Sequence, residues 1–269
     1  MSDLFNAILL GIVQGATEFL PISSSAHMIL VRDALSFHGV HELAFDAVLQ
    51  LATALAVIVY FWADLFRLLQ TCIRMVKGQL VDEKEKILLY ALMLGTIPAV
   101  VGGLALEHLM ETAFRNPLYV AFALVAGSGL FAYAEYMFAM RQRAPLTVRS
   151  GTTVGLFQVL ALVPGVSRSG ATISGGLLLG LSRTEATRFA FLLSVPILLG
   201  SGLKKFIEIL HSPGDISFIA LGAGAFVSFT VGMIAIHFLL IFVRSHTLWP
   251  FIWYRLVLAA TVLAFVFYG

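Results

Sequence analysis

The sequence has few charged residues. Only 12% of its 269 residues are Asp, Glu, Lys or Arg, whereas 59% are hydrophobic and the mean hydropathy is +0.95. Soluble domains contain about 25% charged residues, so this composition predicts an integral membrane protein. The formal net charge is +2, and no basic run is long enough to follow a phosphate backbone. A nucleic-acid partner is therefore not expected.

Cysteine is also scarce, and a secretion signal is missing. Cys72 is the one cysteine, so the chain cannot form an internal disulfide, and this residue has no metal-ligand spacing. The chain begins with MSDLFN, which is acidic rather than basic, and no short apolar core ends in a small-residue cleavage site. A cleaved signal peptide is therefore not expected.

Long hydrophobic stretches dominate the rest of the chain. A helix crosses a bilayer with about 20 apolar residues, and six stretches reach this length without a break. They are residues 44–62, 86–106, 117–138, 185–203, 216–243 and 248–268. The sequence therefore predicts an all-α polytopic membrane protein that forms a single membrane domain over residues 1–269.

Two further apolar segments are interrupted by proline. Residues 6–31 are broken at Pro21, and residues 151–181 are broken at Pro164-Gly165. Proline removes a backbone donor and collides with the preceding turn. Irregular backbone at membrane depth is tolerated only where it is buried in protein or lines a wet cavity. Each segment is therefore predicted to form a re-entrant hairpin of two short helices.

The two broken segments resemble each other at an offset of 144 residues. GIVQGATEFLPISSSAHMIL then lies over GLFQVLALVPGVSRSGATIS, and the same offset pairs Phe45 with Phe189. Each hairpin is followed by three predicted spans, which indicates internal repeats over about residues 1–140 and 145–269. An odd number of spans per half turns the second half over in the membrane, so the sequence predicts an inverted-topology repeat.

Loop charges predict the orientation of the chain. Segments 63–86, 139–150 and 244–247 contain nine Lys and Arg residues, whereas segments 32–43, 107–116 and 204–215 contain four. Positive residues accumulate on the cytoplasmic side of a membrane. Both termini are therefore expected outside, although Lys204 and Lys205 fall on the minority side.

A polar pair precedes the first break. Gln14 and Glu18 are four residues apart and share one helix face. A carboxylate in hydrocarbon is costly, so Glu18 should face a cavity, a metal ion or a positive partner. The alternative is a packing role in which the neighbouring serines satisfy the carboxylate.

Hydroxyl groups follow the first break. Ser23, Ser24 and Ser25 come just after Pro21, where a new helix would begin, and His27 lies three residues after Ser24. Serine is a good N-cap, so at least one of the three has a backbone role. A helix N-terminus with several hydroxyls is also a natural anion site.

The second break repeats the hydroxyls and adds a cation. Ser167, Ser169 and Thr172 follow Pro164, and Arg168 lies between the two serines. The planar guanidinium of arginine suits two oxygens of one phosphate group. If the two halves meet, they form a cavity that suits an anionic head group on a lipid tail. A phosphoryl-lipid hydrolase is favoured over a carrier.

The spacing also suggests a nucleophile. Ser24 and His27 share a helix face, so His27 could take the proton of the Ser24 hydroxyl. The competing mechanism is attack by a water that Glu18 or a metal activates. Trp249, Trp253 and Tyr254 are predicted to form an interfacial aromatic belt rather than part of a site.

Two motifs resemble the undecaprenyl-diphosphatase family, the bacitracin-resistance proteins of bacterial inner membranes. They are (E/Q)-x-x-x-E, here Gln14 to Glu18, and P-G-x-S-R-S-x-x-T, here Pro164 to Thr172. SSSAH, residues 23 to 27, also matches. The resemblance implies an inverted repeat with two re-entrant helix pairs, and removal of the terminal phosphate of undecaprenyl diphosphate at the outer face of the plasma membrane. The other common lipid-phosphatase signature, S-R-x5-H-x3-D, fails, because Ser174 stands six residues after Arg168.

The resemblance also implies ligands and roles. Together with the residue types and spacing described above, it supports the prediction of catalytic roles for Glu18, Ser24, His27 and Arg168, and of substrate contacts from Gln14, Ser23, Ser25, Ser167, Ser169 and Thr172. It further implies a divalent metal, Mg²⁺ or Ca²⁺, with Glu18 and Gln14 as the candidate ligands. Many members have glutamate in place of Gln14, so a metal site built on two carboxylates would have only one of them in this chain. The predicted partners are a polyprenyl diphosphate lipid and the bilayer, with a homodimer left open; a lipid transporter or flippase is the alternative function.

Overall fold

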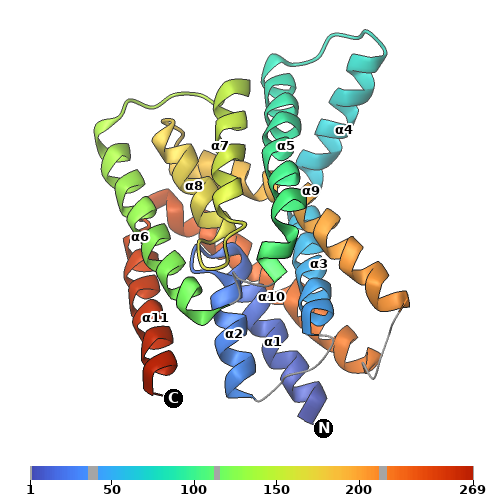
Figure 1. Ribbon diagram of the computed structural model, residues 1–269. Helices are drawn as coiled ribbons and strands as arrows, with labels where there is room; N and C mark the ends of the chain where they lie inside the picture. The colour runs from blue at the N-terminus through green and yellow to red at the C-terminus, as the bar shows by residue number, and fades with distance from the viewer. Residues whose placement is uncertain (1, 36–41, 112–115, 212–216, 269) are drawn as a thin grey trace.

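The computed structural model describes residues 2–35, 42–111, 116–211 and 217–268, and within these ranges all the regular structure is helical. This confirms the all-α prediction. The described residues form eleven helices, which lie together in a single bundle (Figure 1). They are α1 (Ser2–Phe19), α2 (Ser24–Ala34), α3 (Glu42–Tyr60), α4 (Trp62–Val76), α5 (Glu83–Glu111), α6 (Pro117–Met140), α7 (Val148–Leu160), α8 (Arg168–Leu178), α9 (Arg183–His211), α10 (Phe218–Ser245) and α11 (Trp249–Tyr268).

The predicted spans correspond to helices of the structure. Within α5, α6, α9, α10 and α11 lie segments long and apolar enough to cross a membrane, which confirms a polytopic membrane protein. The sixth predicted span, 44–62, corresponds to α3, which is followed directly by α4. These two helices are long and apolar enough to cross a membrane only when taken together, and they are bent by 76° at their junction. The prediction of a loop over residues 63–86 is therefore wrong for residues 63–76, which belong to α4.

Both proline-broken segments form pairs of short helices. In Figure 1, α1 and α2 extend from the end of the bundle where both termini lie, whereas α7 and α8 extend from the opposite end. The connecting turns, residues 20–23 and 161–167, meet inside the molecule. We call them the first turn and the second turn.

The same local structure closes both turns. Ser23 is the N-cap of α2 and accepts a hydrogen bond from the Ala26 amide, and Ser167 caps α8 by accepting from the Gly170 amide. Their φ angles are 74° and 75°. A serine with positive φ is strained, and here the strain recurs at two positions that are 144 residues apart.

Glycines allow each long half-helix to pack closely. A Cβ at Gly11 of α1 would lie 2.4 Å from the Gly224 carbonyl oxygen of α10, and a Cβ at Gly155 of α7 would lie 2.1 Å from the Gly95 carbonyl oxygen of α5. Gly11 and Gly155 also differ by 144 residues. These contacts bring the backbones together and fix the depth at which each turn is held.

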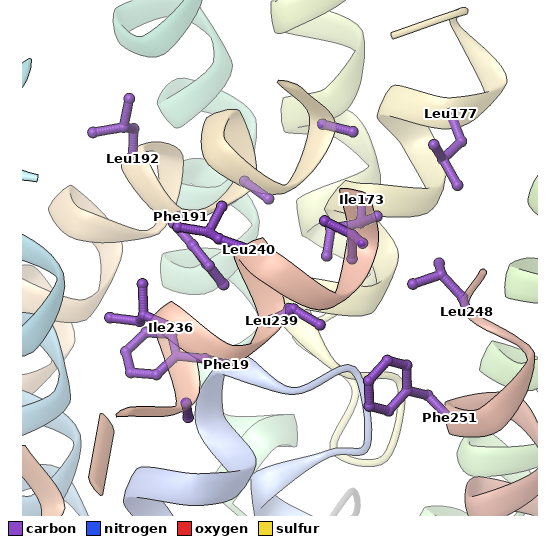
Figure 2. Packing of buried hydrophobic residues seen from close by; sticks show 14 of the residues in the cluster. Phe19, Ile173, Leu177, Phe191, Leu192, Ile236, Leu239, Leu240, Leu248 and Phe251 are labelled. Carbon is purple, nitrogen blue, oxygen red and sulfur yellow. The ribbon is translucent and has the colours of Figure 1, made fainter. Parts of the chain in front are cut away.

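A hydrophobic core surrounds the region where the turns meet. Figure 2 shows Phe19 at the end of α1 close to residues of α9 and α10, and Ile173 and Leu177 of α8 belong to the same cluster. The rings of Phe19 and Phe191 meet edge to face, with centroids 5.4 Å apart and planes at 84°. This packing places the start of the first turn against a close-packed hydrophobic core.

Candidate active site

The two turns enclose a polar cavity of about 160 Å³. It is lined by Glu18, Ser23, Ser24, Ser25, Gln50, residues 161–165, Ser167 and Arg168. The turns are joined directly, because the Gly165 amide donates to Ser25 Oγ at 3.3 Å and Ser169 Oγ donates to the Leu20 carbonyl at 3.2 Å. The cavity therefore exists only where the two halves of the chain meet.

Glu18 is the centre of the polar network. Its side chain is 3% exposed. One oxygen, Oε2, accepts from Gln14 Nε2 at 2.9 Å and from Ser24 Oγ at 2.7 Å. The other, Oε1, accepts from Arg168 Nη2 at 2.6 Å. A buried carboxylate is therefore stabilised by one cation and two neutral donors.

Arg168 brings a positive charge from the second half to the carboxylate of the first. It is the first residue of α8, and its side chain is 17% exposed, so the guanidinium still reaches the cavity. The recorded ion pair with Glu18 uses one nitrogen. A planar guanidinium held in this way can present its remaining N–H groups to phosphate oxygens.

The helix starts add to the positive field. The N-termini of α2 and α8 are both at the cavity, with Ser23 and Ser167 in its wall. The first amides of a helix have no partner within the helix and carry a partial positive charge. Together with Arg168, these two ends make the cavity suitable for an anion.

His27 is held away from Ser24. Its Nδ1 lies 2.7 Å from the Ser23 carbonyl oxygen, and its Nε2 lies 2.7 Å from the Tyr254 hydroxyl. A carbonyl oxygen can only accept, so Nδ1 carries a proton. The Ser24 hydroxyl instead donates to Glu18. The structure thus does not bring together the predicted Ser24–His27 pair, and His27 is not in the cavity wall.

Three other predicted residues lie behind the wall. Gln14 supports Glu18 from within α1. Ser169 links the two turns. Thr172 is fully buried and donates within α8 to the Arg168 carbonyl at 2.8 Å. The cavity gives no support to the prediction that these three bind substrate; they shape the residues that line it.

Three residues at or near the site were not predicted. Gln50 of α3 lines the cavity, Tyr254 of α11 contacts His27, and Arg255 of α11 donates to the Gly165 carbonyl at 3.0 Å. Arg255 had a signal in the sequence, because an arginine inside an apolar span is costly and marks a candidate functional residue. Gln50 had none, since a single amide in a helix is ordinary.

The oxygen atoms at the cavity are suitable ligands for a hard cation that is also bound by the substrate. Among the described residues there is no group of three or more His, Cys, Asp or Glu side chains that could hold a metal. The wall does provide one carboxylate, four serine hydroxyls and an amide. Mg²⁺ is commonly held by one or two carboxylates, waters and substrate phosphates, so this donor set fits a metal that arrives with a diphosphate.

Comparisons with known proteins agree with this chemistry. Residues 7–261 match the family described as bacitracin resistance protein BacA. The chain is 44% identical over 272 residues to undecaprenyl-diphosphatase from Trichlorobacter lovleyi, covering 99% of this chain and 98% of the relative. It is 41% identical to the undecaprenyl-diphosphatases of Micrococcus luteus and Rubrobacter xylanophilus, covering 96% and 98% of this chain and 95% and 98% of those relatives.

Proposed function

Since this chain belongs to the bacitracin resistance protein BacA family, we propose that it hydrolyses undecaprenyl diphosphate to undecaprenyl phosphate and inorganic phosphate. It is a multi-pass membrane enzyme, an undecaprenyl-diphosphatase, and its family name connects this activity with bacitracin resistance. The product is the monophosphate form of the lipid carrier used in cell-wall synthesis. The transporter alternative is set aside, because the similar proteins are named for a hydrolytic activity.

One observation carries the assignment of the site. Ser24 and Arg168 both bond to the Glu18 carboxylate, at 2.7 and 2.6 Å, although Arg168 lies 150 residues away in sequence. A hydroxyl, its hydrogen-bond acceptor and a phosphate-binding cation therefore meet at one anion-attracting cavity. A carrier needs the cation but has no need of a hydroxyl that is bonded to a buried carboxylate.

The geometry supports the following reaction. Ser24 Oγ attacks the terminal phosphorus while its proton passes to Glu18 Oε2, and the bond from that phosphorus to the bridging oxygen breaks. Undecaprenyl phosphate leaves with the bond's electron pair. Water then attacks the phosphoserine, and the proton returns to Ser24 as inorganic phosphate leaves. Arg168 and the starts of α2 and α8 bind the phosphoryl oxygens and stabilise their charge in both steps.

This reaction revises the predicted role of His27. The predicted base was His27, but the hydrogen bond from Ser24 goes to Glu18. His27 instead holds the strained Ser23 in place through its carbonyl. The alternative in which Glu18 activates a water directly, with Ser24 binding phosphate, uses the same cavity and is separated from this one by trapping experiments.

A divalent cation would be held by Glu18 and the cavity hydroxyls together with the substrate's phosphate oxygens. Bound there, it would neutralise charge on the diphosphate and on the leaving group. Gln14 is not in the wall and acts on the site through its bond to Glu18. The protein residues perform each proton transfer described above.

The placement in the membrane is part of the proposal. An inverted-topology repeat with re-entrant hairpins α1–α2 and α7–α8 is supported by the turns entering from opposite ends (Figure 1) and by the recurring offset of 144 in the caps and close-packed glycines. The excess of Lys and Arg in three segments on one side supports termini that face the outside of a bacterial plasma membrane, and the family resemblance implies a site that opens to the same side.

Phosphate release from undecaprenyl diphosphate by the purified protein in detergent tests the function. We expect turnover by the wild type and almost none by Glu18→Gln. The matched control is Glu185→Gln, because Glu185 is exposed and only bonds Ser182 at the start of α9; this variant should remain active. Binding of the lipid without phosphate release by the wild type would contradict a hydrolase.

A further inference from the structure

Two consecutive residues of α11 reach both turns. Tyr254 donates its hydroxyl towards His27 Nε2 at 2.7 Å, and the two rings lie nearly parallel, with centroids 5.6 Å apart and planes at 4°. Arg255 Nη2 donates to the Gly165 carbonyl of the second turn at 3.0 Å. α11 belongs to neither motif of the family resemblance, and Tyr254 was predicted to be part of an aromatic belt.

The Tyr254 contact continues to the first turn. Because His27 Nδ1 donates to the Ser23 carbonyl, Nε2 of the neutral ring has a free lone pair, which accepts the Tyr254 hydroxyl hydrogen. Ser23 has φ 74° and lies in the cavity wall beside Ser24. A strained residue keeps its conformation only when its surroundings hold it. The chain Tyr254–His27–Ser23 is such a support.

Arg255 is an unusual buried cation. It is 0% exposed, and in the described part of the chain its partners are Ser128 Oγ at 3.1 Å, the Leu124 carbonyl at 3.0 Å, the Gly165 carbonyl and the face of Phe131. None of these is a carboxylate, and its Nη1 has no hydrogen-bond partner there. A buried charge without a counter-ion is costly. An arginine at this position therefore indicates a functional role that offsets the loss of stability.

The surroundings of Arg255 are shaped to admit it. A Cβ at Gly127 would lie 2.3 Å from Arg255 Nη2, so only glycine at this position of α6 leaves room for the guanidinium. Gly165 is equally constrained, with φ +105° and a Cβ position 2.6 Å from the Val120 carbonyl oxygen. Its amide bonds Ser25 of the first turn while its carbonyl accepts from Arg255. Gly165 therefore transmits the position of α11 to both turns.

From these contacts we infer that Tyr254 and Arg255 are positioning residues for the diphosphatase reaction. Tyr254 acts through His27 and Ser23 on the first turn, and Arg255 acts through Gly165 on the second turn. Together they fix the distance across the cavity between Ser24 on one side and Arg168 on the other. Neither lines the cavity, so neither is assigned a contact with the reacting atoms. The inference rests on the proposed function for its kinetic consequences.

Tyr254→Phe tests the first arm, because it removes the hydroxyl and keeps the ring. We expect kcat to fall by about tenfold to a hundredfold, as expected for a misplaced nucleophile, with KM and the melting temperature in detergent unchanged. The control is Trp253→Phe, since Trp253 is 62% exposed on the same helix. In a His27→Ala background, Tyr254→Phe should cause no further loss, because its partner is gone.

Arg255→Lys tests the second arm, because Arg255 bonds Ser128 from Nε and the Leu124 and Gly165 carbonyls from Nη2, whereas lysine has all its donors on one nitrogen and lacks this planar geometry. We expect a larger loss of kcat than for Tyr254→Phe and normal behaviour of the control Arg244→Lys, where Arg244 is exposed near the end of α10. If Arg255→Lys does not fold, the positioning role is tested by Tyr254→Phe alone and by its combination with His27→Ala.

Hydrogen exchange separates this inference from the proposed function. In purified protein, Tyr254→Phe should raise amide exchange at residues 20–27, and Arg255→Lys should raise it at 161–167, whereas the two controls should not. A wild type that releases no phosphate would overturn the proposed function and leave this measurement valid. Unchanged exchange in both variants, wild-type kcat in Tyr254→Phe, or a loss that adds to that of His27→Ala would overturn the positioning role.

Discussion

At the scale of single residues, the site depends on how Glu18 shares its two oxygens. One oxygen accepts from Ser24 and the other from Arg168. A phosphate group that binds Arg168 competes with the carboxylate for the same guanidinium. In the proposed reaction, substrate binding would then leave Glu18 with fewer donors at the moment when it takes the proton of Ser24. On this proposal the ion pair is a resting arrangement of the groups that react.

Arg168→Lys should lose most activity although it keeps the charge. Lysine can bond one phosphate oxygen but cannot present a planar pair of N–H groups to two. We expect kcat/KM to fall by about a hundredfold or more, the scale of a lost donor to transition-state charge. Phosphate release is measured beside Arg149→Lys, an exposed position in α7. Near-normal turnover by the Arg168 variant would show that the planar pair of N–H groups is not needed to bind the phosphate.

Replacing the amide of Gln14 by a carboxylate should affect activity differently from replacing the carboxylate of Glu18 by an amide. Gln14→Glu puts a second carboxylate where the Gln14 amide now lies 2.9 Å from Glu18 Oε2, so it should remain active and become more dependent on added Mg²⁺, which would offset the repulsion between the two carboxylates. Glu18→Gln removes the acceptor of both Ser24 and Arg168 and should abolish turnover. Titrating Mg²⁺ against phosphate release for both variants checks this, and equal behaviour would contradict separate roles.

Ser24→Ala decides between the two nucleophiles. If Ser24 attacks phosphorus, the variant should retain less than about a hundredth of the wild-type rate, and rapid quenching of the wild type should trap phosphoserine at position 24. Ser245→Ala is the matched control, since Ser245 is an exposed serine at the end of α10 whose hydroxyl contacts His246 rather than the cavity. A Ser24 variant with a tenth of the rate and no trapped phosphoserine would leave water as the nucleophile.

Much of the site could be predicted from residue types alone, but its hydrogen bonds could not. A carboxylate, a run of serines and an arginine inside apolar segments are visible in the sequence because each is costly in a membrane. The helical spacing of Ser24 and His27 predicted contact between them, yet their side chains leave α2 towards different neighbours, Glu18 and Tyr254. Those neighbours come from other helices, and sequence spacing does not report on them.

At the scale of helices, close packing of glycines sets the depth of the turns. Gly11→Ala and Gly155→Ala would each drive a methyl group into a backbone carbonyl of the facing helix. We expect each to lower stability by about 1–3 kcal/mol, seen as a lower melting temperature in detergent. Gly222→Ala in α10 has open space around its Cβ and should be neutral or slightly stabilising. Equal melting temperatures for all three would contradict this account.

Helix extents were predicted better than helix directions. Hydropathy marks where apolar residues run, so α5, α6, α9, α10 and α11 were found with small errors at their ends. The bend of 76° between α3 and α4 was missed. α4 carries Arg67 and Arg74. A segment with this many charges is not recognised as a membrane span when apolar residues are counted, so it was predicted to be a loop. In the structure only Leu68 and Thr71 of α4 are buried, so most of this helix is exposed.

At the scale of the whole molecule, the two halves contribute different chemistry to similar hairpins. The cap serines and their hydroxyl partners recur at an offset of 144, but Glu18 has Leu162 and Arg168 has Ser24 at the matching positions. Gln158, which matches Gln14, is buried and its amide has no hydrogen-bond partner among the described residues. Similar scaffolds thus hold complementary charges, so the site forms only when both turns reach the same depth.

The orientation of the molecule can be tested with its own cysteine. Cys72 is exposed on α4, and α4 extends towards the end of the bundle opposite the two termini (Figure 1). If the excess of Lys and Arg places that end in the cytoplasm, a membrane-impermeant maleimide should not label Cys72 in intact spheroplasts and should label it after permeabilisation.

A cysteine at the other end completes this test. Ser217 is exposed at the start of α10, near the end where the termini lie in Figure 1. In a Cys72→Ser background, Ser217→Cys should be labelled in intact spheroplasts, because that end faces the outside. Labelling of Cys72 but not of position 217 would invert the orientation. In that orientation the end of the bundle from which α7 and α8 extend, rather than the end from which α1 and α2 extend, would face the outside.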